Sequence, residues 1–172
     1  MARYKIYNAP SPTTAAIVPV TTGTAIKTML QVQISATLGA HIVEWGISFD
    51  AAAMALKTIC ELVEQDVAAT VTAHVTAGIH RLDAAAVQGG DPVSNLVLVG
   101  TGATGYTASA ENSPTVSRMF DAQLVDPATG YVLQFPLGER PYMKPGTFFT
   151  KIRVDATAAA AANALCYVVI EV

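Results

Sequence analysis

The nine residues HIVEWGISF, numbers 41–49, carry the clearest alternation of side chains in the chain. In an extended strand successive side chains point to opposite faces, so every second residue shares a face. One face therefore carries His41, Val43, Trp45, Ile47 and Phe49, and the other carries Ile42, Glu44, Gly46 and Ser48. This stretch predicts a β-strand whose Trp45 side chain points into a hydrophobic core.

Segments with similar patterning lie on both sides of this strand and are separated by turn residues. They span 26–36, 57–64, 70–76, 96–99, 106–110, 116–124, 131–137, 148–154 and 165–172. A count of roughly nine or ten short strands predicts an all-β fold of the β-sandwich type. A jelly roll, with its eight strands in two sheets, is compatible with this count, and so are other sandwiches.

Two alanine-rich stretches compete with the all-β interpretation, because Ala is the best helix former. Residues 51–56 could form a helical turn, and residues 156–164 could form a loop or a single helical turn before the last strand. Residues 89–92, Gly-Gly-Asp-Pro, predict a turn. The length of 172 residues suits one hydrophobic core, so we expect a single domain over residues 21–172.

Residues 1–20 differ in composition from the rest, since they contain Pro10, Pro12 and Pro19. Proline supplies no backbone donor to a sheet ladder. We therefore expect an extended N-terminal arm over residues 1–20. Such an arm either reaches a neighbouring molecule or lies along an edge of its own domain.

The chain is poor in charge: only 13% of its residues are charged, against about 25% in ordinary soluble domains. Hydrophobic residues make up 52%, yet no run approaches the roughly 18 to 20 apolar residues that a membrane-spanning helix needs. A neutral surface of this kind is typical of a protein covered by neighbouring protomers or another protein, and a stable monomer with a threonine-rich surface is the alternative. We expect no membrane partner.

The net charge is −3, and lysine and arginine residues are scattered singly. This pattern does not predict a nucleic-acid partner, because a phosphate-binding face needs clustered cations. The N-terminus lacks the apolar segment of a secretory signal, so we expect synthesis in the cytoplasm. Cys60 and Cys166 lie in separate apolar runs and are expected to be buried free thiols.

One motif could indicate a nucleotide site: residues 100–105, GTGATG, match the dinucleotide-binding fingerprint. That motif requires a following helix whose amides face the pyrophosphate. Residues 106–111, YTASAE, show no helical apolar stripe, and Pro114 follows soon after. We interpret the motif as a glycine-rich loop and predict no cofactor.

No other group of residues predicts catalysis or metal binding. His41, His74 and His80 have no partner at a recognised ligand spacing, and His74 and His80 are expected to be exposed. Alternation places Glu61 and Glu64 on opposite faces of a strand, so they do not form an acid and base pair. A nucleophile motif of the Gly-x-Ser-x-Gly type does not occur. We predict a protein that is not an enzyme, with no catalytic, cofactor or metal residues.

Five segments of the chain carry a family resemblance. They are residues 21–27 (TTGTAIK), 43–49 (VEWGISF), 105–111 (GYTASAE), 134–138 (QFPLG) and 167–171 (YVVIE). The chain resembles small head structural proteins of tailed phages of the actinobacteriophage kind. This resemblance implies a capsid decoration or cement protein, a β-rich homotrimer on the outside of an expanded capsid that clamps adjacent capsomers. Its partners would be the major capsid protein and further copies of itself.

An acidic chain suits the outer surface of a capsid better than its DNA-facing interior. If the arm pairs with a neighbour's sheet edge, its anchors would be Tyr4, Ile6 and Tyr7. Within a trimer, Tyr142, Met143 and Phe149 are the candidate interface residues. Core positions such as Trp45, Ile47 and Phe120 should matter for folding.

Two alternatives remain open at this point. A tail-tube or head-completion subunit would form rings instead of surface trimers. A carbohydrate-binding β-sandwich would use exposed aromatic side chains, and Tyr131 and Tyr142 are the candidates for that role.

Overall fold

The computed structural model describes residues 2–12, 14–50, 57–82, 96–100, 102–156 and 162–172. Within these ranges the chain forms thirteen strands and one 3₁₀ turn, η1 (Thr76–Gly78). The strands are β1 (Arg3–Tyr7), β2 (Val20–Thr21), β3 (Ile26–Val32), β4 (Ala40–Phe49), β5 (Thr58–Gln65), β6 (Thr70–Ala73), β7 (Ile79–Arg81), β8 (Gly105–Ala110), β9 (Ser117–Val125), β10 (Tyr131–Gln134), β11 (Tyr142–Met143), β12 (Phe149–Asp155) and β13 (Asn163–Glu171). The predicted all-β fold is confirmed.

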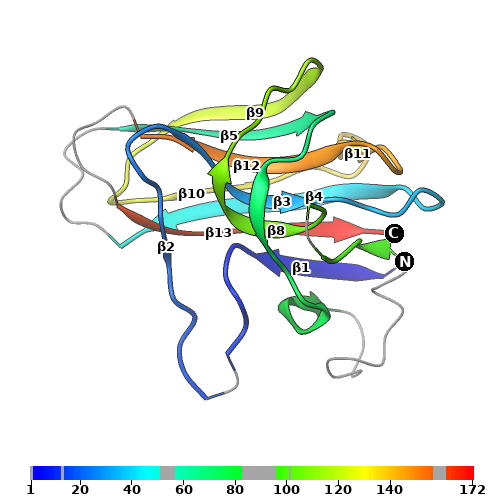
Figure 1. Ribbon diagram of the computed structural model, residues 1–172, viewed down its shortest axis with the longest axis horizontal. Helices are drawn as coiled ribbons and strands as arrows, with labels where there is room; N and C mark the ends of the chain where they lie inside the picture. The colour runs from blue at the N-terminus through cyan, green and yellow to red at the C-terminus, as the bar shows by residue number, and fades with distance from the viewer. Residues whose placement is uncertain (1, 13, 51–56, 83–95, 101, 157–161) are drawn as a thin grey trace.

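The strands form two sheets that pack face to face as a β-sandwich (Figure 1). The first sheet has the order β10-β4-β13-β1-β7, with β11 beside β4 and β2 beside β13. The second sheet has the order β6-β8-β3-β12-β5-β9. Pairs of neighbouring strands within both sheets are antiparallel. This arrangement places β9 and β10, which are consecutive in the chain, at the ends of different sheets.

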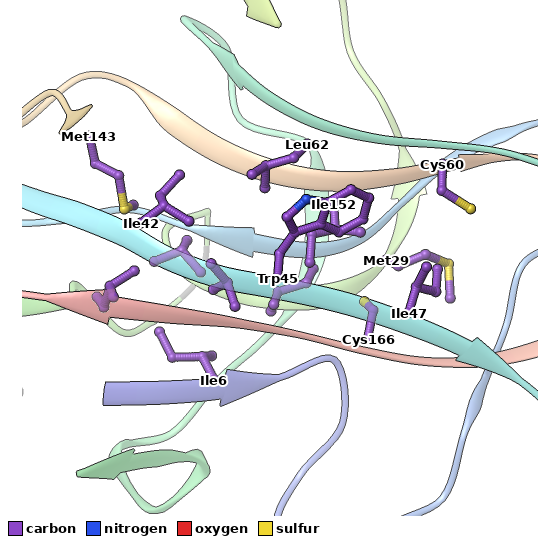
Figure 2. Packing of buried hydrophobic residues seen from close by; sticks show 14 of the residues in the cluster. Ile6, Met29, Ile42, Trp45, Ile47, Cys60, Leu62, Met143, Ile152 and Cys166 are labelled. Carbon is purple, nitrogen blue, oxygen red and sulfur yellow. The ribbon is translucent and has the colours of Figure 1, made fainter. Parts of the chain in front are cut away.

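The core lies between the two sheets and is built from the inward side of each alternating strand (Figure 2). Trp45 is fully buried and Ile47 is 3% exposed, as their alternation predicts. Phe120 is only partly buried against this cluster. Cys60 and Cys166 are buried free thiols, which confirms the expectation for both. Burial raises the pKa of the Cys60 thiol to about 12, so it stays protonated at neutral pH.

Residues 3–7 differ from the prediction, because this part of the expected arm forms β1 inside the first sheet. Tyr4 pairs with Ile170 and Ile6 pairs with Val168 on one side, and β7 pairs on the other. The segment RYKIY alternates as a strand does, and the prolines that suggested an arm begin only at position 10. The connection from β1 to β2 extends from the body of the sandwich (Figure 1).

Several other expectations concern short segments. Leu96–Val99 forms isolated bridges, Ile34 with Val97 and Val99 with Thr104, instead of a strand. The predicted turn at 89–92 and the helical turn at 51–56 lie outside the described residues, as does the part of the alanine tract over 157–161.

Candidate functional site

Four of the six predicted interface residues lie inside the protomer. Tyr4 and Ile6 on β1 are 4% and 0% exposed, and Met143 and Phe149 are 1% and 9% exposed. Their side chains face the core or are covered by neighbouring segments, so in this fold they stabilise the protomer and offer no surface to a partner. Tyr4 and Ile6 were expected on an arm, whereas β1 pairs on both sides within the first sheet. For Met143 and Phe149 parity explains the error: in Tyr142-Met143 and Phe148-Phe149 both neighbours are apolar, so alternation does not say which one points inward.

The other two predicted interface residues reach the surface. Tyr7 is half-buried on the outer face of the first sheet, and Tyr142 is 43% exposed. The Tyr142 ring lies 5.2 Å from the His41 ring, centroid to centroid. It also covers Gly39 so closely that a Cβ at position 39 would overlap the Tyr142 hydroxyl group. Tyr142 is therefore an exposed aromatic side chain held in a fixed position.

Exposed apolar side chains concentrate in the segment that contains Tyr142. Twelve large hydrophobic residues of the described part of the chain are exposed, and six of them fall within residues 116–142. We call these six the apolar strip: Val116, Met119, Leu124, Val132, Leu137 and Tyr142, which are 52%, 48%, 61%, 61%, 82% and 43% exposed. Val116, Met119 and Leu124 lie in β9 or directly before it, and Val132, Leu137 and Tyr142 lie on β10, on β11 or between them. Val132 lines a hollow on the outer face of the first sheet together with Tyr7 and Tyr167.

Polar contacts from β9 hold the elements of this side together. The Asp121 carboxylate accepts hydrogen bonds from Trp45 Nε1 on β4 at 3.1 Å and from the Tyr131 hydroxyl on β10 at 2.9 Å. Arg118 donates to the backbone carbonyl of Tyr142 on β11 at 2.5 Å. These bonds join the end strand of the second sheet to three strands of the first. The strip is thus carried by a braced surface.

The edge of β9 is open in the described part of the chain, where β5 is its one strand neighbour. Open edges are usually protected by outward-pointing charges or prolines, because unpaired backbone groups can pair with another chain. A β-bulge interrupts the pairing of β9 with β5 between Leu62 and Val63, and the two charged residues of β9 make internal contacts, Arg118 with Glu64 at 2.7 Å and Asp121 with Trp45. β9 is nine residues long and carries exposed apolar side chains beside backbone groups that no strand of the described residues pairs with.

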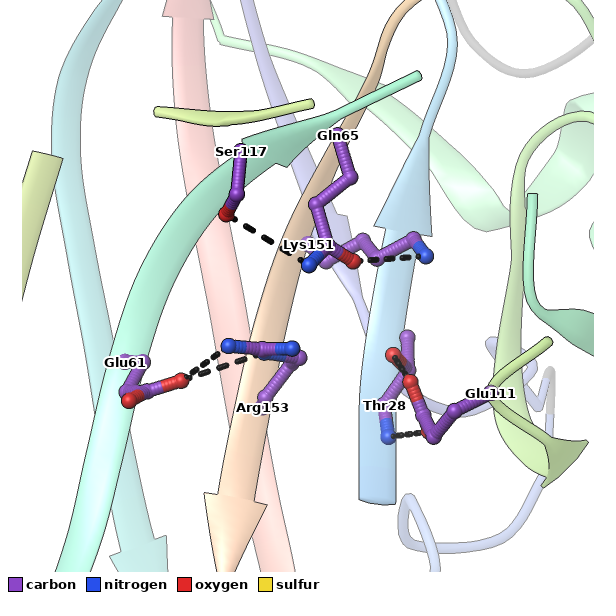
Figure 3. Close-up of polar contacts among 7 residues, drawn as sticks. All are labelled: Thr28, Glu61, Gln65, Glu111, Ser117, Lys151 and Arg153. Carbon is purple, nitrogen blue, oxygen red and sulfur yellow. Dashed lines mark hydrogen bonds and ion pairs between the residues drawn. The ribbon is translucent and has the colours of Figure 1, made fainter. Parts of the chain in front are cut away.

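Buried polar contacts form a second cluster on the side of the second sheet that faces away from the core (Figure 3). Lys151 on β12 is fully buried, and its ammonium group donates to Gln65 Oε1 at 3.0 Å and to the Val67 carbonyl at 2.8 Å. Gln31 accepts from the Ala69 amide at 2.8 Å. These contacts tie the β5–β6 connection to β3 and β12. Burial lowers the pKa of Lys151 to about 8.

The cluster continues through charged pairs on the same sheet. Arg153 binds Glu61 across β12 and β5 at 2.5 Å, and Glu111 accepts from the Thr28 hydroxyl at 2.6 Å. Glu64 binds Arg118 instead, so Glu61 and Glu64 serve separate pairs. The two carboxylates therefore have different arginine partners.

The histidines occupy three different environments. His74 is 2% exposed, so the prediction that it is exposed is wrong. Its ring nitrogen Nε2 lies 2.6 Å from the Tyr7 carbonyl oxygen, and burial lowers the pKa of the imidazole. His80 lies 2.5 Å from the Ser11 hydroxyl, and His41 is exposed beside Tyr142. Within the described ranges no three His, Cys, Asp or Glu side chains are grouped to hold a metal ion.

The glycine-rich motif ends in a strand. Gly105 begins β8, which pairs with β3 and β6, where the dinucleotide fingerprint would require the start of a helix. A Cβ at position 105 would lie 2.4 Å from the Thr72 carbonyl, so this glycine is explained by the close approach of β6.

Of the two tyrosines considered for sugar stacking, Tyr142 is 43% exposed, whereas Tyr131 is half-buried by contacts within the protein. Tyr131 packs against Trp45 at 5.3 Å between ring centroids and donates its hydroxyl to Asp121. On the outer face of the first sheet, the Lys5 ammonium lies 3.6 Å from the centre of the Tyr167 ring. The same ring lies against Gly46, where a Cβ would come within 2.9 Å of it. The Tyr167 ring is therefore in contact with both Lys5 and the backbone at Gly46.

Comparison of the chain with family models, curated proteins and solved structures finds no match. Among the described residues, no helix has the length and apolar character needed to cross a bilayer.

Proposed function

We propose that this chain is a non-enzymatic virion protein that decorates the outside of a phage capsid and stabilises it by clamping adjacent capsomers. The observation that supports the proposal is the apolar strip, two residues of which, Met119 and Leu124, lie on the open-edged strand β9. Exposed large apolar side chains that are concentrated in one segment often mark a surface that another molecule covers.

The distribution of charge supports an outer position on the capsid. Three arginines are paired within the protomer: Arg118 with Glu64, Arg153 with Glu61, and Arg140 with Glu171. Cations used in this way are not free for phosphate groups, and the chain carries a net charge of −3. DNA inside a capsid would repel such a surface, whereas a neutral or acidic exterior position carries no such cost.

The proposed mechanism is stabilisation by mass action. A protein that binds the assembled, expanded lattice better than free subunits shifts the equilibrium toward the lattice. Copies joined in a homo-oligomer, which we propose to be a trimer, would bind several lattice sites at once and gain avidity without any covalent chemistry. The partners are the major capsid protein and further copies of this chain.

Co-sedimentation with expanded capsids that lack the protein tests the proposal. The purified chain is titrated to saturation, and bound copies are counted against the major capsid subunit. We expect saturation at a fixed ratio set by lattice symmetry. A folded protein that does not bind would refute decoration, and saturation at a few copies per particle would instead favour a ring-forming tail or head-completion subunit.

Matched variants identify the surface involved. Met119→Asp combined with Leu124→Asp places two charges on the apolar strip, and we expect the loss of most binding. Val75→Asp is the control, because Val75 is 63% exposed and lies outside the strip. Equal binding by both variants would exclude the strip as the contact surface.

A further inference from the structure

Lys151 is the most unusual side chain of the second sheet. Lysine is almost never fully buried without a charged partner, because its ammonium group loses hydration. Lys151 is fully buried, and its two direct partners, the Gln65 side chain and the Val67 carbonyl, are both neutral. The free energy lost by desolvating this ammonium group is large for a side chain that only anchors the β5–β6 connection.

The geometry brings an amine and a carboxamide together. Lys151 Nζ lies 3.0 Å from Gln65 Oε1, on neighbouring strands β12 and β5, and Gln65 is 3% exposed (Figure 3). The residues are offset by two positions in the ladder, where Lys151 pairs with Val63 and Gln65 pairs with Phe149. Long side chains reach across such a diagonal.

We propose that Lys151 and Gln65 react to form an isopeptide bond that joins β12 to β5 covalently. The neutral amine of Lys151 attacks Cδ of Gln65, and a new Nζ–Cδ bond forms. The Cδ–Nε2 bond then breaks, the proton lost by Nζ passes to Nε2, and one ammonia leaves. No oxidant, reductant or other co-reactant is needed.

Two features of the surroundings favour this reaction. Burial lowers the pKa of Lys151 to about 8, so an appreciable share of the amine is neutral near pH 7 to 8, and neutral amine is the nucleophile. Gln65 Nε2 lies 3.5 Å from the Ser117 hydroxyl, which can relay the proton to the departing nitrogen. Ser117 is exposed, so the ammonia is released at the surface.

The close placement of the Lys151 amine and the Gln65 carboxamide favours the rate of the reaction. The hydrogen bond from Nζ to Oε1 places the amine beside the carboxamide group, and well-oriented intramolecular reactions can show effective molarities of about 10⁵ to 10⁸ M, which offset the low intrinsic reactivity of a carboxamide. Lys151 is held by two acceptors, and both reacting groups are shielded from competing water. Charges near the amine include Glu111 and Asp66, which favour the ammonium form, and Arg153, which opposes it.

Mass spectrometry of the intact, denatured chain tests the proposal, after incubation at about pH 9, where the amine is mostly neutral. We expect a mass lower than that of the sequence by one ammonia. Trypsin does not cleave before proline, so the expected linked peptides are 58–81, with Gln65, and 119–153, with Lys151 left uncleaved.

Three variants make the result specific. Lys151→Arg keeps the charge but removes the reactive amine, and Gln65→Met removes the carboxamide; both should have full mass. Lys57→Arg, at an exposed lysine, should keep the deficit. Full mass of the unsubstituted chain with a free 119–151 peptide would overturn the proposal. A deficit that persists in Lys151→Arg would also overturn it, because ammonia would then come from another amide.

Discussion

Substitution of Asp121 by alanine should destabilise the sandwich strongly, because one carboxylate joins the two sheets at their open side. It accepts hydrogen bonds from Trp45 Nε1 and from the Tyr131 hydroxyl. Hydrogen bonds to a charged group contribute about 1.5 to 3 kcal/mol each, so two such bonds correspond to roughly 3 to 6 kcal/mol. Asp121 is itself only half-buried, and solvent screening reduces this sum.

We therefore expect Asp121→Ala to lower the free energy of unfolding by about 3 kcal/mol, out of a typical total of about 5 to 15 kcal/mol. Trp45 is fully buried, so its indole donor would lose its partner without gaining water. Asp121→Asn keeps one acceptor oxygen and should cost less, about 1 kcal/mol. Tyr131→Phe should also cost about 1 kcal/mol, since it removes only one of the two bonds.

Denaturant unfolding followed by tryptophan fluorescence measures these differences directly, since Trp45 is the one tryptophan of the chain. Glu139→Gln, which removes an exposed negative charge, is the control and should change stability little. A second readout is the absorbance titration of tyrosine. Burial and the Asp121 hydrogen bond raise the pKa of Tyr131 to about 12, and Asp121→Asn should lower it. Unfolding within ~0.5 kcal/mol of the unsubstituted chain, with no change in that titration, would refute the reasoning.

Three further predictions concern the core and the outer face of the first sheet. Ile6→Ala should cost about 2 to 5 kcal/mol in equilibrium unfolding, because Ile6 is fully buried in a central strand; a flexible arm would lose almost nothing. Gly46→Ala should lower the free energy of unfolding by about 1 to 3 kcal/mol in the same assay, because its methyl group would lie 2.9 Å from the Tyr167 ring. An unchanged denaturation midpoint would show that the ring moves aside freely. Burial lowers the pKa of His74 below its usual value of 6.5, so the unfolded chain binds the proton more readily than the folded chain does, and the free energy of unfolding should fall as the pH drops through about 6.5. Denaturant unfolding at pH 5 and pH 7.5 should show a smaller pH dependence for His74→Phe than for the unsubstituted chain. An equal pH dependence in both proteins would contradict this prediction.

The fold class could be predicted because the strong alternation around Trp45, and in the segments that became β5, β9 and β13, is a local property of the sequence. The membership of each strand in a sheet is not local. β1 lies between β13 and β7, which are far from it in the sequence, and nothing in RYKIY indicates those neighbours. The prolines after it suggested an arm, although they affect only the following connection.

The surface was harder to predict than the core. Met143 and Phe149 were expected at an interface as outward apolar positions, but both are buried, and a one-residue change of parity reverses the face of a strand residue. The sequence did not predict the exposed apolar residues on β9, for a different reason. Met119 and Leu124 look like ordinary strand residues until the order of the sheet shows that β9 lies at its end.

The behaviour of β9 links the stability of the protomer to its proposed assembly. The two charged side chains of this edge strand, Arg118 and Asp121, make internal contacts with β4, β10 and β11. They therefore brace this side of the sandwich, while the exposed side chains of Met119 and Leu124 on the same strand are apolar. An isolated protomer with such an edge is prone to self-association, and a partner surface that covers the strip removes that hazard while gaining the burial of apolar area. The bracing also means that little ordering is needed on binding, so most of the gain from burial would be available to hold the protein on the proposed capsid lattice.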